Sequence, residues 1–162
     1  MTQAEDTRIP PCREAFTAST RELLATMAQL DAECVKVCRF RNAGVSREVA
    51  ARMEVQGATR GTVVAATDMK LAGRIVGRMT GKTDSELTPA EIAGGFKEIL
   101  NIIAGSAKSR LAGQPGHFEL TCPEPWDGDG AAVEKRTGAD LTAVVFEVDG
   151  VRFASGFSFA AS

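Results

Sequence analysis

A carboxylate and a carboxamide lie three residues apart in the second half of the chain, at Glu98 and Asn101. Residues at positions i and i+3 of a helix project from the same face. A carboxylate attracts cations, and a carboxamide both donates and accepts hydrogen bonds, so it can hold a water molecule. Such a pair is also common on ordinary solvated helix faces, and its spacing leaves both interpretations open.

The helix that would carry this pair is predicted from Thr88 to the C-cap residue Gly113. Thr88-Pro89-Ala90-Glu91 places threonine at the N-cap, proline at the first helical position and glutamate at the third. An apolar stripe marks the buried side of the helix. It consists of Ile92, Phe96, Ile99, Leu100, Ile103, Ala107 and Leu111.

The opposite stripe of the same helix is polar and contains glycine. It consists of Glu91, Gly94, Glu98, Asn101, Gly105 and Lys108. Gly94, Gly95 and Gly105 each cost about 1 kcal/mol relative to alanine in a helix interior. Either another body approaches the helix backbone closely at these positions, or the glycines pack against a neighbouring helix.

Other segments alternate between helical and strand patterns. Two further helices are predicted, one from Cys12 to Leu30 with Phe16, Leu23, Met27 and Leu30 on its buried face, and one between the cap residues Asp68 and Gly81. The strands expected from alternation and turn signals are Cys34–Cys38, Val49–Val55, Gly61–Ala65, Phe118–Thr121, Leu141–Val148 and Val151–Phe159.

The last two strands are joined by Asp149-Gly150, a strong hairpin signal, whereas Asp127–Gly130 is predicted to be a loop. The fold class is therefore α/β of the α+β type, with a mostly antiparallel sheet and long helices. We expect one domain over residues 1–162, with its core at about 12–159.

The composition excludes several classes of protein. With 162 residues, 44% of them hydrophobic and 25% charged, the chain is typical of a globular domain. Nineteen basic and 21 acidic residues give a net charge of −2, which disfavours nucleic-acid binding. No apolar run is long enough to span a membrane, and the polar N-terminus lacks a signal core, so we expect a cytoplasmic protein.

Other catalytic or metal-binding sites are poorly supported. The four cysteines (Cys12, Cys34, Cys38, Cys122) are expected to be buried or half-buried thiols. Cys34 and Cys38 would share one face of a strand, yet two further zinc ligands are missing nearby. His117, the single histidine, has no evident nucleophile partner. The segment Gly77–Thr83 is one residue too short for a Walker phosphate loop.

The segment Glu98-Ile99-Leu100-Asn101, followed by Gly105, resembles the signature helix of CheX in the CheC/CheX/FliY family of chemotaxis phosphatases. The resemblance extends in order over about residues 12–159. It includes the first helix, the glycine-flanked strand after Gly57, the helix from Asp68 to Gly81 and Thr121-Cys122-Pro123. The segment 124–138 does not align clearly. A single Glu-x-x-Asn motif is present, as in CheX.

This resemblance implies a phosphatase that hydrolyses the aspartyl phosphate of a CheY-like response regulator. Asn101 would position the attacking water, and Glu98 would dock the lysine of the regulator's active site. Gly94, Gly105 and Lys108 on the same stripe would contact the partner. Mg²⁺ would be bound to the regulator, so the chain would need no cofactor or metal of its own. The alternative is a non-catalytic module that binds a signalling partner.

The resemblance also implies a homodimer in which a C-terminal strand is exchanged between subunits. Val151, Phe153, Phe157 and Phe159 lie on one face of the last predicted strand and carry substantial apolar area. The same strand could instead complete the sheet of its own subunit.

Overall fold

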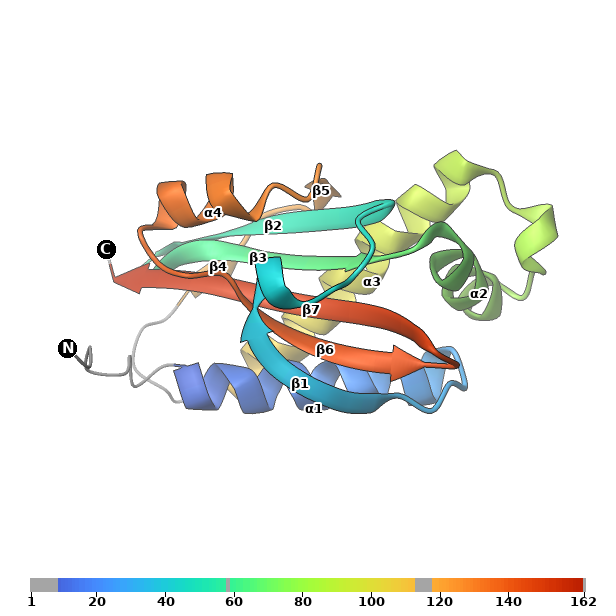
Figure 1. Cartoon of the computed structure of the whole chain (residues 1–162), viewed down its shortest axis with the longest axis horizontal. Coiled ribbons are helices and arrows are strands. Elements are labelled where there is room, and N and C mark those ends of the chain that lie inside the picture. The colour runs from blue at the N-terminus through green and yellow to red at the C-terminus, as the bar shows by residue number, and fades with distance from the viewer. Residues whose placement is uncertain (1–8, 58, 113–117, 162) are drawn as a thin grey trace.

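The computed structural model describes residues 9–57, 59–112 and 118–161. Figure 1 shows the helices arranged around one sheet. The helices are α1 (Ile9–Met27), α2 (Met69–Thr80), α3 (Pro89–Arg110) and α4 (Gly130–Thr137), with short 3-10 turns η1 (Phe40–Asn42) and η2 (Asp84–Glu86). The strands are β1 (Glu33–Arg39), β2 (Val49–Gly57), β3 (Thr59–Thr67), β4 (Phe118–Leu120), β5 (Glu124–Pro125), β6 (Thr142–Val148) and β7 (Val151–Ala161).

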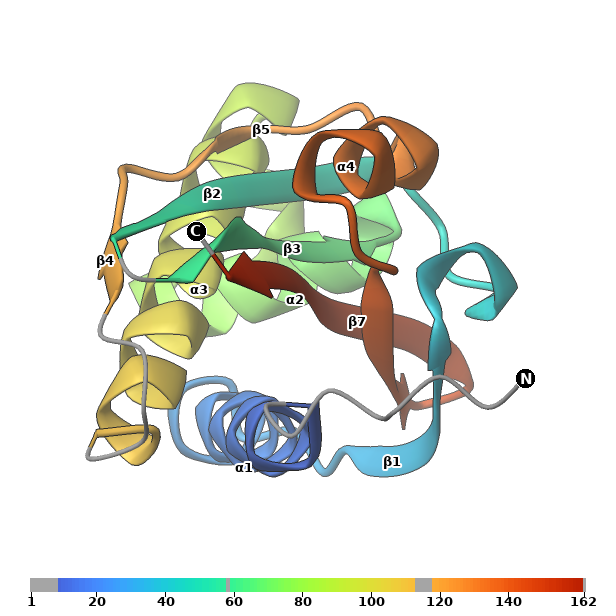
Figure 2. The same cartoon turned by 90° about the vertical axis from the view of Figure 1, so that its left-hand side faces the viewer.

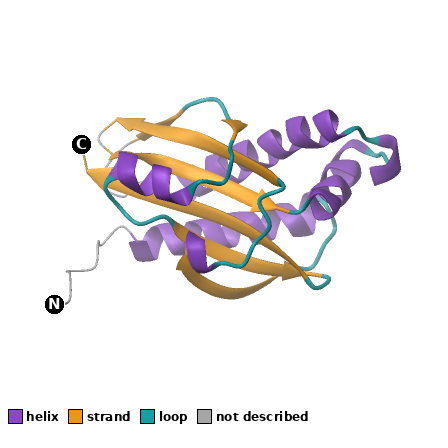
Figure 3. Ribbon diagram, turned by 45° about the horizontal axis from the view of Figure 1, so that its top comes forward, coloured by secondary structure: helices purple, strands orange, loops and turns teal. Residues whose placement is uncertain are grey.

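The strands form one antiparallel sheet in the order β1-β6-β7-β3-β2-β4, with β5 pairing with another part of β2. Helices α1, α2 and α3 cover one face of this sheet, and α4 and η1 lie on the other (Figures 2 and 3). The predicted α+β class and antiparallel sheet are therefore confirmed. Within the described residues, no helix combines the length and apolar character needed to cross a membrane.

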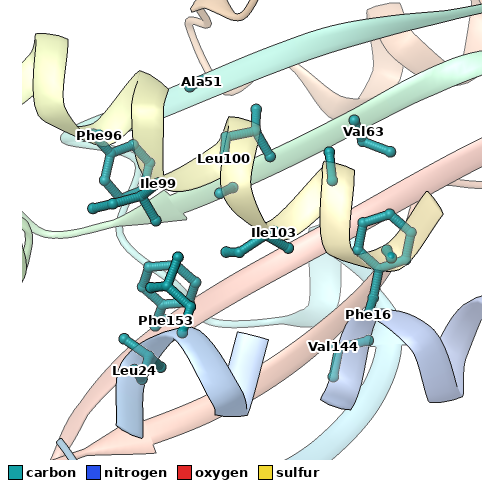
Figure 4. Packing of buried hydrophobic residues seen from close by; sticks show 14 of the residues in the cluster. Phe16, Leu24, Ala51, Val63, Phe96, Ile99, Leu100, Ile103, Val144 and Phe153 are labelled. Atoms are coloured by element: carbon teal, nitrogen blue, oxygen red, sulfur yellow. The ribbon is translucent and has the colours of Figure 1, made fainter. Parts of the chain in front are cut away.

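Alternating side chains of the strands divide the core between the two faces. Val63 and Ala65 face the large cluster under α1, α2 and α3, whereas Val64 and Ala66 face a smaller cluster with Val133 of α4. In Figure 4, the α3 side chains lie against the sheet and near Phe16 and Leu24 of α1. The apolar stripe predicted for α3 is buried as expected: Ile92, Phe96, Ile99, Leu100, Ile103, Ala107 and Leu111 are each at most 9% exposed.

The buried face of α1 differs from the prediction at one position. Phe16, Leu23 and Leu30 are buried, but Met27 is 41% exposed. The helix ends at Met27, so the chain turns away there and Leu24, fully buried, fills the inner position instead.

The β1 strand contains an irregularity that corrects the prediction for its cysteines. The register against β6 shifts between Cys34 and Lys36, so that Cys34 lies opposite Phe146 but Cys38 lies opposite Ala143. The extra residue turns the two thiols to opposite faces, where Cys34 packs on the large cluster and Cys38 on the small one. Cys122 is exposed, contrary to the expectation that all four thiols are at least half-buried.

Helix α4 is absent from the sequence prediction. Asp127–Asp129 does form the expected loop, but Asp129 then caps the helix by accepting a hydrogen bond from the Ala132 amide at 3.1 Å. Gly138 ends the helix in the left-handed conformation, at φ 72°. Both cap signals are present in the sequence, although only eight residues separate them.

The β6–β7 hairpin matches its prediction. Asp149 and Gly150 both have positive φ, at 50° and 79°, as a two-residue hairpin turn of type I′ requires. Strand β7 then lies between β6 and β3 of its own chain, and Phe153, Phe157 and Phe159 enter the large cluster. The chain thus completes its own sheet here, and the exchanged homodimer stays a prediction.

Candidate functional site

Helix α3 is fixed at its start by the predicted capping box. The Glu91 amide donates to the Thr88 hydroxyl at 3.1 Å, and the Thr88 amide donates to the Glu91 carboxylate at 3.1 Å. The hydrogen bond from the Thr88 amide, followed by that of the Thr88 side chain, holds the pKa of the Glu91 carboxyl below its usual value. The helix ends at Arg110 with Leu111 as its cap. Gly113, the predicted cap, lies outside the described residues, as does His117.

The two candidate site residues lie on the outer face of this helix. Glu98 and Asn101 are exposed, whereas Ile99 and Leu100 between them are completely buried. Neither polar side chain has a hydrogen bond or ion pair with any residue that the structure describes. The carboxylate and the carboxamide are therefore held on a rigid, well-packed helix with their polar groups available to a partner.

The three glycines of α3 separate into two kinds. A Cβ atom added to Gly95 would lie 2.5 Å from Cγ1 of Val76, so this glycine allows close packing of α3 against α2. A Cβ atom added to Gly94 or Gly105 would meet nothing within 4 Å. Packing within the chain accounts for Gly95 but gives no reason for Gly94 and Gly105, which flank Glu98 and Asn101 on the outer stripe.

Lys108 lies on the outer stripe but is not isolated. Its ammonium group is 3.3 Å from the Glu119 carboxylate of β4, and its side chain is 35% exposed. The sequence prediction missed this pair, because no local pattern links a helix residue to a strand beyond an intervening loop. Nearby, Ser19 of α1 donates to Ser106 at 3.0 Å, and Glu22 pairs with Arg110, so polar contacts join α1 to the C-terminal part of α3.

A metal site would require several ligands close together. Among the residues that the structure describes, no group of three or more histidine, cysteine, aspartate or glutamate side chains is placed to hold an ion. The outer stripe of α3 offers one carboxylate and one carboxamide, which suit contacts with a partner's charged and polar groups.

A comparison with family models decides the family. The model described as "Chemotaxis phosphatase CheX" matches residues 49–147, more than half of the 162 residues and all of α3. The chain belongs to the CheX family. No curated protein matches the sequence.

Solved structures of CheX and related proteins share the fold over nearly the whole chain. CheX from Vibrio vulnificus is 25% identical with a TM-score of 0.75, covering 98% of this chain and 100% of that one. A CheC-like superfamily protein from Shewanella sp. PV-4 is 17% identical with a TM-score of 0.77, covering 93% and 98%. CheX in a CheX–CheY–BeF3–Mg²⁺ complex from Borrelia burgdorferi is 19% identical with a TM-score of 0.70, covering 90% and 96%.

The structure thus brings the predicted residues of this CheX-family chain onto one surface. Gly94, Glu98, Asn101 and Gly105 follow one another along the outside of α3, and Lys108 continues the stripe while paired with Glu119. Their roles toward a partner remain predictions.

Proposed function

We propose that this protein hydrolyses the aspartyl phosphate of a phosphorylated CheY-like response regulator, in the cytoplasm, as part of a two-component signalling pathway. The observation that carries the proposal is the exposed Glu98 and Asn101 pair, which has no partner among the described residues and lies on a helix whose inner face is buried in a CheX-family fold. The related CheX from Borrelia burgdorferi was solved in complex with CheY, BeF3 and Mg²⁺, which supports a regulator of this kind as partner.

Asn101 orients the attacking water in this proposal. Phosphoryl transfer to water leaves little covalent chemistry for a protein, so positioning and charge stabilisation dominate catalysis. The Asn101 carboxamide accepts a hydrogen bond from the water through its oxygen and donates one through its nitrogen, which places the water in line with the phosphorus. This role needs no proton transfer by the side chain.

Glu98 sets the docking geometry. It lies one turn before Asn101, so a salt bridge from its carboxylate to a lysine beside the regulator's phosphoaspartate fixes where Asn101 enters the regulator's site. Gly94 and Gly105, which carry no side chain, let the regulator's loops approach the helix backbone. Lys108 contacts the regulator at the end of the same stripe.

The metal in this reaction belongs to the partner. Mg²⁺ bound to the regulator neutralises charge on the phosphoryl group, and the outer stripe of α3 adds the amide that orients water. We propose further that the protein forms a homodimer in which each subunit presents its own Glu98 and Asn101.

The test compares Asn101→Ala with a matched substitution elsewhere. Asn42, in η1, is also exposed but lies on the other face of the sheet, so Asn42→Ala is the control. Loss of aspartyl phosphate from candidate regulators is followed with each variant. We expect Asn101→Ala to lose roughly 100-fold or more in rate, because the water is no longer oriented, and Asn42→Ala to retain it.

Binding of the activated regulator should be nearly unchanged in Asn101→Ala. Equal rates for Asn101→Ala and the parent would refute the assignment of Asn101. A parent protein that binds the activated regulator but never accelerates dephosphorylation would identify a binding module.

A further inference from the structure

A second polar site lies on the face of the sheet opposite to α3. It is a cavity of about 340 Å³ where the ends of β2 and β7, the start of β3 and the last turn of α4 come together. Figure 2 looks toward this end of the molecule, with α4 on one side of the sheet and α3 on the other. The cavity is lined by Glu54, Val55, Gln56, Arg60, Gly61, Arg136, Thr137 and Ala160.

The floor of this region is polar although it is buried. Thr62 and Ser158 face the same side of the sheet and are 0% and 1% exposed. The Thr62 hydroxyl accepts from the Arg136 guanidinium at 3.1 Å, and Ser158 lies 2.6 Å from the Thr137 hydroxyl. Elsewhere on this face, Val64, Ala66 and their neighbours form an apolar cluster. The buried hydroxyl groups of Thr62 and Ser158 therefore lie beside the cavity, at the end of the sheet away from this apolar cluster.

The charges around the cavity are unequal. Arg136 pairs with Glu54 at 3.1 Å. Arg52, also on β2, lies 3.5 Å from Glu54 and 3.1 Å from Glu124. The guanidinium of Arg60 has no hydrogen bond or ion pair with any described residue. Among the described lining residues there are thus two guanidinium groups and one carboxylate, which leaves one net positive charge, and the donors of Arg60 are available.

The two guanidinium groups and the size of the cavity favour a small ligand with an anionic group. Guanidinium groups present several N–H donors in a planar fork that matches carboxylate and phosphate oxygens. The volume is near the lower end of the range of about 300–1,000 Å³ typical of small-molecule sites, and it exceeds the space that an inorganic ion needs. Gln56 and Thr137 add neutral hydrogen-bonding groups to the lining.

We propose that this cavity binds a small organic anion carrying a phosphate or a carboxylate group, held between the guanidinium groups of Arg60 and Arg136. The site lies across the sheet from Glu98 and Asn101, so a bound anion leaves the outer stripe of α3 accessible. The proposal is independent of the phosphatase function.

The experiment is a titration of the full-length ¹⁵N-labelled protein, followed by backbone amide shifts. Phenyl phosphate and benzoate share a ring and differ in the anionic group, and benzamide is the neutral control. We expect saturable shifts at Gln56, Gly61 and Thr137 with one or both anions and none with benzamide. The response to each anion identifies which group the cavity takes.

Arg60→Gln is the decisive variant, because the exposed Arg60 side chain supports no other described residue, whereas loss of Arg136 would leave the Glu54 carboxylate without its closest cation. Removing a charge-assisted hydrogen bond should weaken binding of the anion roughly tenfold or more. Arg78→Gln, which removes an exposed arginine from α2, is the matched control and should bind like the parent.

Asn101→Ala should also bind like the parent, which separates this site from the phosphatase site. The proposal is overturned if neither anion gives saturable shifts at millimolar concentration. It is equally overturned if Arg60→Gln binds the anion as tightly as the parent and the control Arg78→Gln do.

Discussion

At the scale of single residues, some polar side chains on the outer face of α3 have partners within the chain and others do not. Glu91 is tied into the capping box and lies 3.6 Å from Lys82, and Lys108 is paired with Glu119. Glu98 and Asn101 lie between them without such contacts among the described residues. Lys82 and Lys108 are thus paired with other carboxylates, and the Glu98 carboxylate is available for the proposed contact with a cation of the regulator.

Reversing the charge at Glu98 tests this directly. Glu98→Lys should weaken binding of the activated regulator more than Asn101→Ala does, because attraction to the regulator's lysine becomes repulsion. Titration of the regulator against both variants measures the difference, which should shrink as salt is raised. Unchanged affinity for Glu98→Lys would remove this residue from the interface.

A second charged residue reports on stability at acid pH. Asp140, before β6, accepts a hydrogen bond from the Arg39 guanidinium of β1, and this hydrogen bond lowers the pKa of Asp140. A lowered pKa in the folded state stabilises the protein above the unfolded value of about 3.9, and that contribution is lost as the pH falls through the folded value.

Asp140→Asn should therefore lower the free energy of unfolding near pH 7 by at most about 1 kcal/mol, because the pair is largely exposed. The difference from the parent should disappear in urea unfolding below the lowered pKa. A difference that persists unchanged into strong acid would mean that the effect is not caused by the charge of Asp140.

At the scale of elements, one side of α3 packs in the core, and the other side carries the residues that we propose contact a partner. Its inner side chains are buried in the core, where the centroids of the Phe96 and Phe153 rings lie 5.9 Å apart. Its outer side carries two glycines with open space above them. The helix therefore gains its stability from packing and from its cap, and not from the propensities of its exposed residues.

Alanine substitutions should separate the glycines. Gly94→Ala adds a methyl group in open space and should raise the free energy of unfolding by up to about 1 kcal/mol, while weakening regulator binding. Gly95→Ala places that group against Val76 and should lower the free energy of unfolding by about 1 kcal/mol or more. Chemical unfolding and regulator titration measure both effects. Equal stabilisation by the two substitutions would contradict the packing described for Gly95.

The sequence predicted most elements whose signals are local and missed features set by distant contacts. Helix α4 is the exception, because its caps Asp129 and Gly138 are local signals but enclose only eight residues. Thr88, Glu91 and the seven-residue apolar stripe define α3 by themselves, and Asp149-Gly150 defines the last hairpin. The turn of Cys34 and Cys38 to opposite faces depends on how β1 pairs with β6, which a single strand pattern does not contain. For the site, spacing alone placed Glu98 and Asn101 correctly on the exposed face, whereas the Lys108–Glu119 pair depends on how β4 is placed beside α3.

At the scale of the whole molecule, β7 is the strand with most to contribute to assembly. It pairs with β3 and β6 along its length, and Ser155 in it contacts Thr20 of α1 at 2.9 Å in the buried interior. A strand exchanged between two copies would make the same contacts as within one copy, so exchange has a low energetic cost.

We therefore expect a dimer in solution. Light scattering at micromolar concentration should give about twice the 17.1 kDa mass of the chain. A mass near 17.1 kDa with no concentration dependence would rule the dimer out.

The sheet order has a further consequence, for the timing of folding during synthesis. The β6–β7 hairpin is made after every other strand, yet it lies between β1 and β3 near the centre of the sheet. Until it emerges from the ribosome, β1 and β3 have unpaired edges, and Phe96 of α3 lacks the Phe153 ring that it packs against. Contacts between such distant segments form slowly. The nascent chain thus exposes these strand edges and the Phe96 side chain until β7 is made, and such surfaces are prone to aggregation.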